Sequence, residues 1–184
     1  MIKKIIYFTF LAFLLASEDN IQLKSSQNTT NILNAHIIND SPIHFGYSYS
    51  SGWSSGPFWI GISCQNIDDI AGFQFELPDD LQLLDASGGR AEEFFSDLHH
   101  NSKGLILGFS MAAKKIPKIQ NLEEDSLLLK MQVKIVEGSS SEFAIKSILA
   151  GANGQKLSFS TTLSELSLES DTGDLKLIKI SFSE

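Results

Sequence analysis

Within the run of residues 70–77, apolar and polar side chains alternate strictly over residues 73–77. The apolar ones share one parity and the polar ones the other: Phe73, Phe75 and Leu77 against Gln74 and Glu76. Because successive side chains of a β-strand point to opposite faces of its sheet, this period of two predicts a strand with one buried face. Such a strand belongs to a sheet that packs against a second layer of the protein.

Similar runs recur along the chain, separated by turn residues. The clearest is the stretch 127–135, whose apolar side consists of Leu127, Leu129, Met131, Val133 and Ile135. Further strands are predicted at residues 43–50, 58–65, 81–84, 105–111, 143–149, 156–161 and 175–182. Residues 52–57 are typical of a loop, and residues 91–98 have the spacing of a short helical turn. Many short strands with almost no helix predict an all-β protein, an antiparallel β-sandwich compatible with jelly-roll topology.

Parity within these runs assigns several side chains to the core or to the surface. In the run 58–65 the apolar side consists of Phe58, Ile60, Ile62 and Cys64. Cys64 is the only cysteine, so no disulfide can form within the chain, and its parity predicts a small buried side chain rather than a nucleophile. Trp59 has the opposite parity and is predicted to point away from the core. In the run 105–111 the alternating apolar set is Leu105, Leu107, Phe109 and Met111.

The first residues have the pattern of a secretory signal peptide. Lys3 and Lys4 precede an apolar run over residues 5–16, and the chain turns polar at Ser17. A membrane anchor is the alternative, but this run is shorter than the roughly twenty apolar residues that a span requires. We therefore predict a signal peptide at residues 1–17 and an extracellular, secreted protein with no membrane span after cleavage.

The remainder of the chain is predicted to have two parts. Residues 18–39 are rich in Asn, Ser, Gln and Thr, and are predicted to form a polar leader or linker that buries too little apolar surface to order itself. Residues 40–184 are predicted to form one β-sandwich domain, since a chain of 184 residues has room for one sandwich of ordinary size. The composition, 42% hydrophobic and 20% charged, suits a domain with a core.

Charge and side-chain chemistry argue against two classes of function. The formal net charge is -8 and the basic residues form no cluster, whereas nucleic-acid binding requires clustered Lys and Arg. His99 and His100 lie beside Asp97, but no nucleophile elbow or other catalytic frame surrounds them. We therefore predict no nucleic-acid partner, no catalytic residue and no enzyme activity.

Calcium is the one metal ion that the sequence leaves open. Adjacent residues of an extended chain point to opposite sides, so the pair His99-His100 does not predict a transition-metal site. Calcium prefers oxygen ligands on loops, and acidic residues gather at three predicted loops: Asp68-Asp69, Asp79-Asp80 and Glu123-Glu-Asp125. Charged loop residues are usually solvated, so we assign no cofactor and no metal ligand and keep calcium as an alternative.

Four segments, taken in order, resemble cohesin-like domains, the family of bacterial extracellular modules best known as receptors for dockerins. They are the run with the Gly-Phe-Gln-Phe strand at residues 66–77, and residues 105–110, 125–133 and 148–155. The resemblance covers residues 58–160 and implies a sandwich of nine strands with jelly-roll topology and no catalytic apparatus. Ala150 and Ala152 depart from the acidic or turn-forming residues that are typical of the last segment.

Two kinds of ligand remain open. A protein partner, such as a dockerin-like module, would dock on the outer face of one sheet, for which the candidate side chains are Gln74, Glu76, Lys130, Gln132 and Lys134. A polysaccharide would stack on exposed aromatic rings, for which Trp53 in the predicted loop and the outward Trp59 are the candidates. The hypotheses differ in their consequences: Trp59→Ala removes sugar retention, whereas charge reversal at Glu76 or Lys130 matters only for a protein partner.

Overall fold

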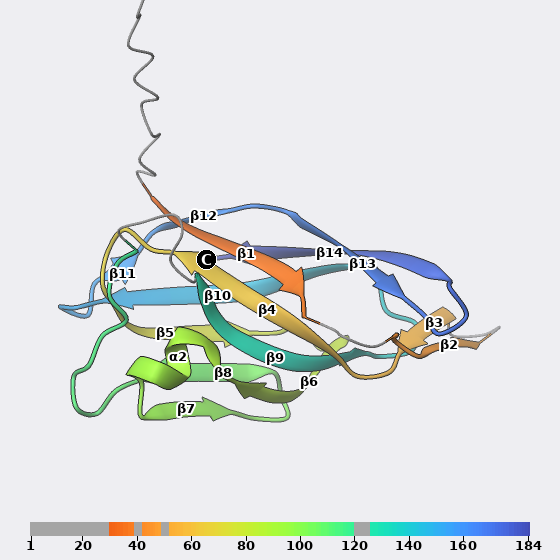
Figure 1. Cartoon of the computed structure of the whole chain (residues 1–184), viewed down its shortest axis with the longest axis horizontal. Coiled ribbons are helices and arrows are strands. Elements are labelled where there is room, and N and C mark those ends of the chain that lie inside the picture. Colours follow the sequence, from red (N-terminus) through yellow and green to blue (C-terminus); the bar gives the residue numbers. More distant parts are fainter. Residues whose placement is uncertain (1–29, 39–41, 49–51, 120–125) are drawn as a thin grey trace, which may run out of the picture.

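The computed structural model describes residues 30–38, 42–48, 52–119 and 126–184, which are almost entirely β-structure (Figure 1). One sheet has five strands, in the order β12 (Phe159–Thr161), β1 (Asn31–Ile37), β4 (Phe58–Gln65), β9 (Leu127–Ile135) and β6 (Leu81–Ser87). The second sheet has seven strands. Six follow the order β13 (Ser164–Glu169), β14 (Leu175–Ser183), β10 (Glu142–Gly151), β5 (Ile70–Glu76), β8 (Leu105–Phe109) and β7 (Asp97–His100), and β11 (Lys156–Leu157) pairs with β10. A separate hairpin consists of β2 (Phe45–Ser48) and β3 (Gly52–Ser55), and α2 (Gly89–Phe94) is the one helix within these ranges.

The two larger sheets form a sandwich, which confirms the predicted fold class (Figure 1). The chain crosses from one sheet to the other between β4 and β5, between β5 and β6, and between β9 and β10, as it does in a jelly roll. Within the described residues the double layer has twelve strands, the five and the seven given above, against about nine predicted. β13 and β14 belong to it, because inward side chains such as Leu168, Ile180 and Phe182 are part of the core, and only the hairpin β2–β3 lies outside the two sheets. Most neighbouring strands are antiparallel, but β1 pairs with β12 and β10 with β14 in parallel.

The core between the sheets uses the side chains that the period of two predicts. Phe73 and Phe75 of β5 are buried, and so are Met131 and Val133 of β9. The ring centroid of Phe75 lies 5.1 Å from that of Phe73 and 6.2 Å from that of Phe182, which belongs to β14. These inward faces determine which side chains of each strand are left for solvent or for a partner.

The folded part begins earlier than predicted, because residues 31–37 of the expected polar leader form β1 inside the five-stranded sheet. Leu33 is fully buried there. Asn31 is buried as well, and its amide nitrogen donates to the Ser158 carbonyl at 2.8 Å while its Oδ1 accepts from the Ile67 amide at 2.9 Å. Because its polar groups have these partners, the Asn31 side chain is buried in the sheet at a low cost in free energy. The prediction that residues 31–37 belong to an unordered leader is therefore wrong. The predicted signal peptide lies outside the described residues.

Three local predictions differ from the structure. The expected loop at residues 52–57 contains β3, which pairs with β2. The helical turn expected at 91–98 is confirmed as α2 but ends at Phe94, and the chain from Asp97 onward is β7 instead. The hairpin partner of β14, strand β13, is missing from the predicted set, although its Leu166 and Leu168 alternate with polar residues. Within the described ranges no helix is long and apolar enough to span a bilayer.

Candidate binding surface

The five sequence-predicted docking residues do not share a face. Gln74 and Glu76 lie on β5 in the seven-stranded sheet, with their side chains on the side opposite the buried Phe73 and Phe75. The other three lie on β9 in the five-stranded sheet and alternate with its buried side chains: Lys130, Gln132 and Lys134. The outer faces of the two sheets are on opposite sides of the sandwich. The predicted single docking face is therefore wrong, although each residue does point outward.

The two tryptophans have different environments. Trp53 is only 7% exposed, because β3 packs its ring against Phe45, with ring centroids 6.1 Å apart, and beneath the ammonium of Lys176 at 4.8 Å. The prediction that Trp53 is an exposed loop residue is wrong. Trp59 is half-buried on the outer side of β4, as predicted, and the Lys130 ammonium lies 5.9 Å from its ring centroid. The structure does not bring the two rings together as one aromatic platform.

The apolar run of β8 faces outward, a feature that sequence reasoning missed. Ile106 and Gly108 are the buried residues of this strand, whereas Phe109 is exposed and Leu107 is half-buried. A Cβ atom at Gly108 would collide with the ring of Phe73, so the inner face of β8 is filled from the neighbouring strand. Ile106 and Gly108 take the inner face of the strand, so Leu105, Leu107 and Phe109 point away from the core.

Neighbouring strands complete an apolar surface around these residues. In the register of the sheet, Leu107 lies opposite Gln74, and Gln74 lies opposite Ile148 of β10. Leu105 lies opposite Glu76, and the exposed Phe109 lies opposite Gly72. We call this surface, made of Gln74, Leu105, Leu107, Phe109 and Ile148, the Leu107 surface. Gln74 is thus the one predicted docking residue at its centre, with Glu76 at its border.

Charged and titratable groups border the Leu107 surface on two sides. Lys146 Nζ lies 3.4 Å from Glu76 Oε1 on the side of β10. On the side of β7, the His99 ring stacks near Phe109 with centroids 6.0 Å apart, and His99 Nε2 lies 3.9 Å from Asp97 Oδ1. A mainly apolar face with a polar border is the composition of a protein-docking surface.

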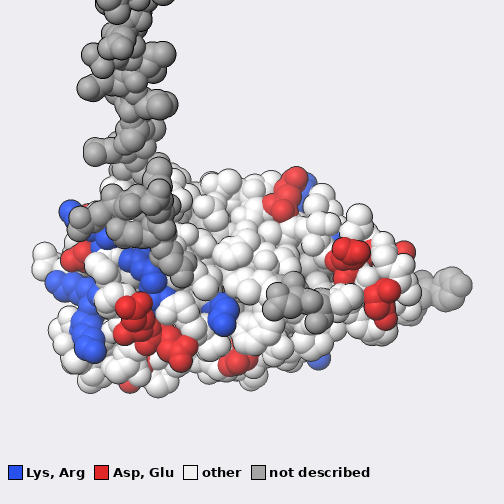
Figure 2. Space-filling model, viewed as in Figure 1, with Lys and Arg blue, Asp and Glu red and all other residues white. Residues whose placement is uncertain are grey.

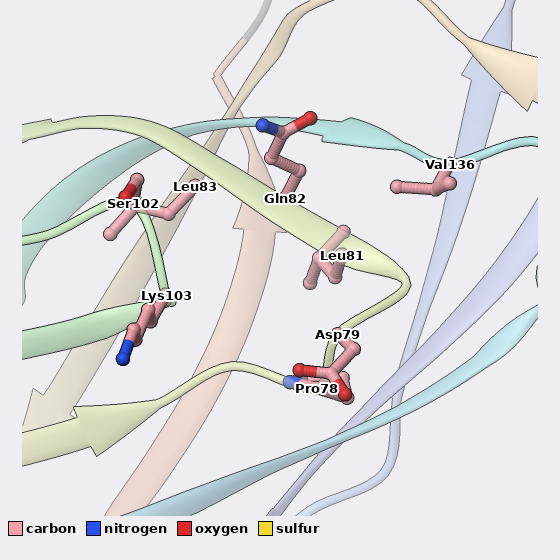
Figure 3. Close-up of a pocket in the computed structure, with 9 residues that line it drawn as sticks. Pro78, Asp79, Leu81, Gln82, Leu83, Ser102, Lys103 and Val136 are labelled. Atoms are coloured by element: carbon pink, nitrogen blue, oxygen red, sulfur yellow. The ribbon is translucent and has the colours of Figure 1, made fainter.

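A cleft of about 150 Å³ lies between the start of β6, the turn before it and the β7–β8 turn (Figure 3). Leu81 and Leu83 line it, and Asp79 and Lys103 come from the two turns. Small-molecule sites usually have volumes of about 300–1,000 Å³, so this cleft is too small for a drug-sized ligand or a sugar chain. The flat sheet face is therefore the better candidate for binding.

Two of the described histidines, His99 and His100, each contact a carboxylate. His100 Nε2 lies 3.3 Å from Asp85 Oδ1 and links β7 to β6, while His99 contacts Asp97. Within the described ranges no three His, Cys, Asp or Glu side chains gather as metal ligands. Asp69 Oδ1 accepts a hydrogen bond from the Lys118 amide at 3.1 Å. The calcium prediction stays a prediction, and its cluster at residues 123–125 lies outside the described residues.

Cys64 is fully buried, as its parity predicts. Burial raises the pKa of its thiol to about 12, against the smaller opposing effect of the Arg90 guanidinium. We expect a disulfide reagent such as DTNB to leave the folded chain unmodified at pH 8 and to titrate one thiol in denaturant. Because the unfolded thiol ionises near pH 9 and the folded one near 12, stability should also fall as pH rises above 9. Rapid labelling of the folded chain would contradict the burial.

In comparisons with known proteins, the chain is similar to a solved structure at low sequence identity. No protein-family model matches the chain, and no curated protein matches it in sequence. Among solved structures, the chain is similar to a non-cellulosomal cohesin from the hyperthermophilic archaeon Archaeoglobus fulgidus, with a TM-score of 0.40 and 8% identity. The match covers 70% of this chain and 82% of the cohesin. With a TM-score this low, the description of the fold rests on the strand order and the core given above.

Proposed function

We propose that the chain is a secreted, non-catalytic, cohesin-like module that attaches to a protein partner, of dockerin type, through the Leu107 surface. The observation that carries the proposal is the outward apolar row on β8 and β10. The outward positions of a solvated antiparallel sheet are normally polar. Here Phe109 is 36% exposed and Ile148 is 43% exposed, and both lie on the same outer face as Leu107. Contiguous exposed apolar side chains of this kind mark interaction sites.

The chemistry of the surface indicates what the partner must present. Leu107 and Ile148 flank Gln74, so an apolar side chain seated between them would also meet an amide that donates and accepts hydrogen bonds. The Glu76–Lys146 pair and His99 at the border suit polar groups around that contact. A small protein element with an apolar centre and a polar periphery fits this arrangement.

Polysaccharide binding is the second candidate, and one feature supports it. Trp59 is half-buried on the outer face of the five-stranded sheet, opposite Gln132 and near the Lys130 ammonium. A ring with hydrogen-bonding neighbours suits a sugar that is apolar on one side. With Trp53 buried, however, this face offers one tryptophan rather than two, which weakens it as a sugar platform. The two candidates use opposite faces and can be tested separately.

The test uses the purified chain immobilised beside three outward variants. Leu107→Glu changes the Leu107 surface, Gln132→Glu is its matched control on the opposite sheet, and Trp59→Ala removes the candidate sugar platform. Each is offered a panel of purified dockerin modules and an array of polysaccharides. Burying a carboxylate at the centre of an interface should weaken protein binding by about 30-fold or more, while the Gln132→Glu chain binds normally.

The outcomes separate the candidates. Binding of a dockerin module that Leu107→Glu removes and Gln132→Glu preserves supports the proposal. If Gln132→Glu removes binding and Leu107→Glu preserves it, the protein site lies on the five-stranded sheet and the proposal is wrong. Retention on a glycan that Trp59→Ala abolishes, with no protein bound by any variant, overturns the proposal in favour of the polysaccharide candidate. Circular dichroism and thermal unfolding confirm that each variant is folded.

A further inference from the structure

Strand β14 has a free edge over its first residues. The Lys179 amide donates to the Ser141 carbonyl at 2.7 Å, and β10 begins at Glu142, opposite Lys179. In an extended strand the backbone groups of residues two apart point the same way, so Leu177 and Leu175 also face the side of β10. Among the described residues, nothing hydrogen-bonds their N–H or C=O groups there. Four backbone groups are therefore left for an outside partner.

Other edges of the seven-stranded sheet are protected. The outer side of β13 is covered, because the Ile43 amide donates to the Glu169 carbonyl at 2.8 Å and the Ala35 amide to Ser164 Oγ at 2.9 Å. The opposite edge strand, β7, is only four residues long and carries an aspartate and two histidines. Short and charged edges discourage strand addition. The open part of β14 instead has two leucines, 69% and 52% exposed at positions 175 and 177.

We propose that β14 pairs antiparallel with β14 of a second copy of this chain, with Leu175 opposite Leu177 of the second copy. In an antiparallel pair, two residues whose backbone groups face each other exchange both hydrogen bonds. A two-fold axis beside Lys176 produces this pair twice, which satisfies all four free groups. The same symmetry gathers the four leucine side chains on one outer face.

The length of the open edge favours a second copy over a longer extended peptide. A long partner strand would run into Ser141, where β10 begins to occupy the edge. In the proposed register the residue opposite Lys179 is Gly173 of the second copy. Gly173 lies in the tight turn between β13 and β14, where its amide donates to the Ser170 carbonyl at 3.0 Å. The backbone of the second copy therefore turns away from β14 at the point where β10 begins to pair with this strand.

Charge makes this association weak and dependent on salt. The two Lys176 residues lie opposite each other at the axis, and like charges directly opposite are destabilising. Acidic side chains gather at the end of the molecule where β2 and β3 lie, as Figure 2 shows, and the exposed Asp171 and Asp174 occupy the β13–β14 turn. Salt screens such repulsion, so the dimer should strengthen as ionic strength rises.

The experiment is sedimentation equilibrium of the purified full chain. Because two residues per copy bury far less than the roughly 1,000 Å² of a stable interface, we expect a monomer at about 10 μM and a dimer at about 1 mM. The dimer fraction should increase between about 50 mM and about 500 mM salt. A monomer under all of these conditions overturns the proposal.

Two variants test the edge itself. Leu177→Pro removes an N–H that faces away from β13, so the β13–β14 ladder keeps its hydrogen bonds, and proline is tolerated at such edge positions. If that chain does not fold, the double change Leu175→Lys with Leu177→Lys keeps the backbone and adds repulsion. Either change should abolish the dimer, while Leu107→Glu should leave it intact. A dimer that survives both edge changes overturns the proposal and leaves dockerin binding untouched. A dimer that Leu107→Glu removes also overturns it, because self-association would then use the Leu107 surface.

Discussion

Replacing Gly89 by alanine should cost about 3–5 kcal/mol of folding free energy, from backbone strain and a steric clash together. Gly89 begins α2 with a φ of 63°, in the left-handed region that side chains disfavour. A Cβ atom there would lie 2.6 Å from the carbonyl oxygen of Leu128. That carbonyl belongs to β9, a central strand paired on both sides, so it cannot retreat without disturbing the sheet. Urea unfolding followed by tryptophan fluorescence measures the loss.

Gly154→Ala is the matched control for this prediction. Gly154 has a similar φ of 74°, but no atom lies within 4 Å of the position that a Cβ would occupy. Its substitution introduces the strain without the clash, so it should cost only about 1–2 kcal/mol. Equal losses at the two positions would show that α2 can move away from β9. The helix would then not be fixed against the sheet as the structure indicates.

The period of two predicts the buried face of a strand well, because burial on one side imposes that period directly. Phe73 and Phe75 on β5 and Met131 on β9 are buried as predicted, and Gln74 and Lys130 point outward. Parity does not reveal which sheet a strand joins, since strand order depends on contacts between distant segments. For that reason residues of β5 and β9 were combined on one face, although the sandwich places them on opposite sides.

Two further differences have the same origin in long-range contacts. The polar letters around Asn31 predict a leader, but the partner of its amide, Ser158, lies 127 residues away in the sequence. The apolar run of β8 would suit a core strand if Gly108 were not covered by the ring of Phe73. The Leu107 surface therefore follows from packing between neighbouring strands. A search for apolar positions of the parity opposite to that of a strand glycine could have pointed to it.

A buried polar network holds the segment that follows the Leu107 surface. After Phe109 the chain forms a loop over residues 110–119, and Ile116 exchanges backbone hydrogen bonds with Ile70 at 2.8 and 2.9 Å. The side chain of Asn66, 1% exposed, donates to the carbonyls of Asp68 at 2.7 Å and Pro117 at 3.0 Å. Its Oδ1 accepts from Arg90 Nη1 at 2.8 Å, and Arg90 Nη2 donates to the Pro117 carbonyl. One amide thus joins the loop, the turn before β5 and α2.

Asn66→Ala should destabilise the chain by about 3 kcal/mol or more. The change removes three hydrogen bonds of a buried side chain, one of them from a guanidinium, and a net loss of about 1 kcal/mol each is typical, with more for a charged donor. Urea unfolding measures the total, and Asn153→Ala, at an exposed turn position, should change stability by less than about 0.5 kcal/mol.

The same variant tests whether the network fixes the end of the docking face. Asn66→Ala removes the hydrogen bond from this side chain to Pro117, which is one of the contacts that hold residues 110–119. The amide hydrogens of Ile116 and Ile119 should therefore exchange with solvent faster than in the parent chain, with the amides of β9 as the reference. Because this loop leaves β8 directly after Phe109, binding at the Leu107 surface should weaken while the core strands remain protected. Unchanged protection at Ile116 and Ile119 would show that their backbone hydrogen bonds to Ile70 and Asn66 hold the loop without the side-chain network.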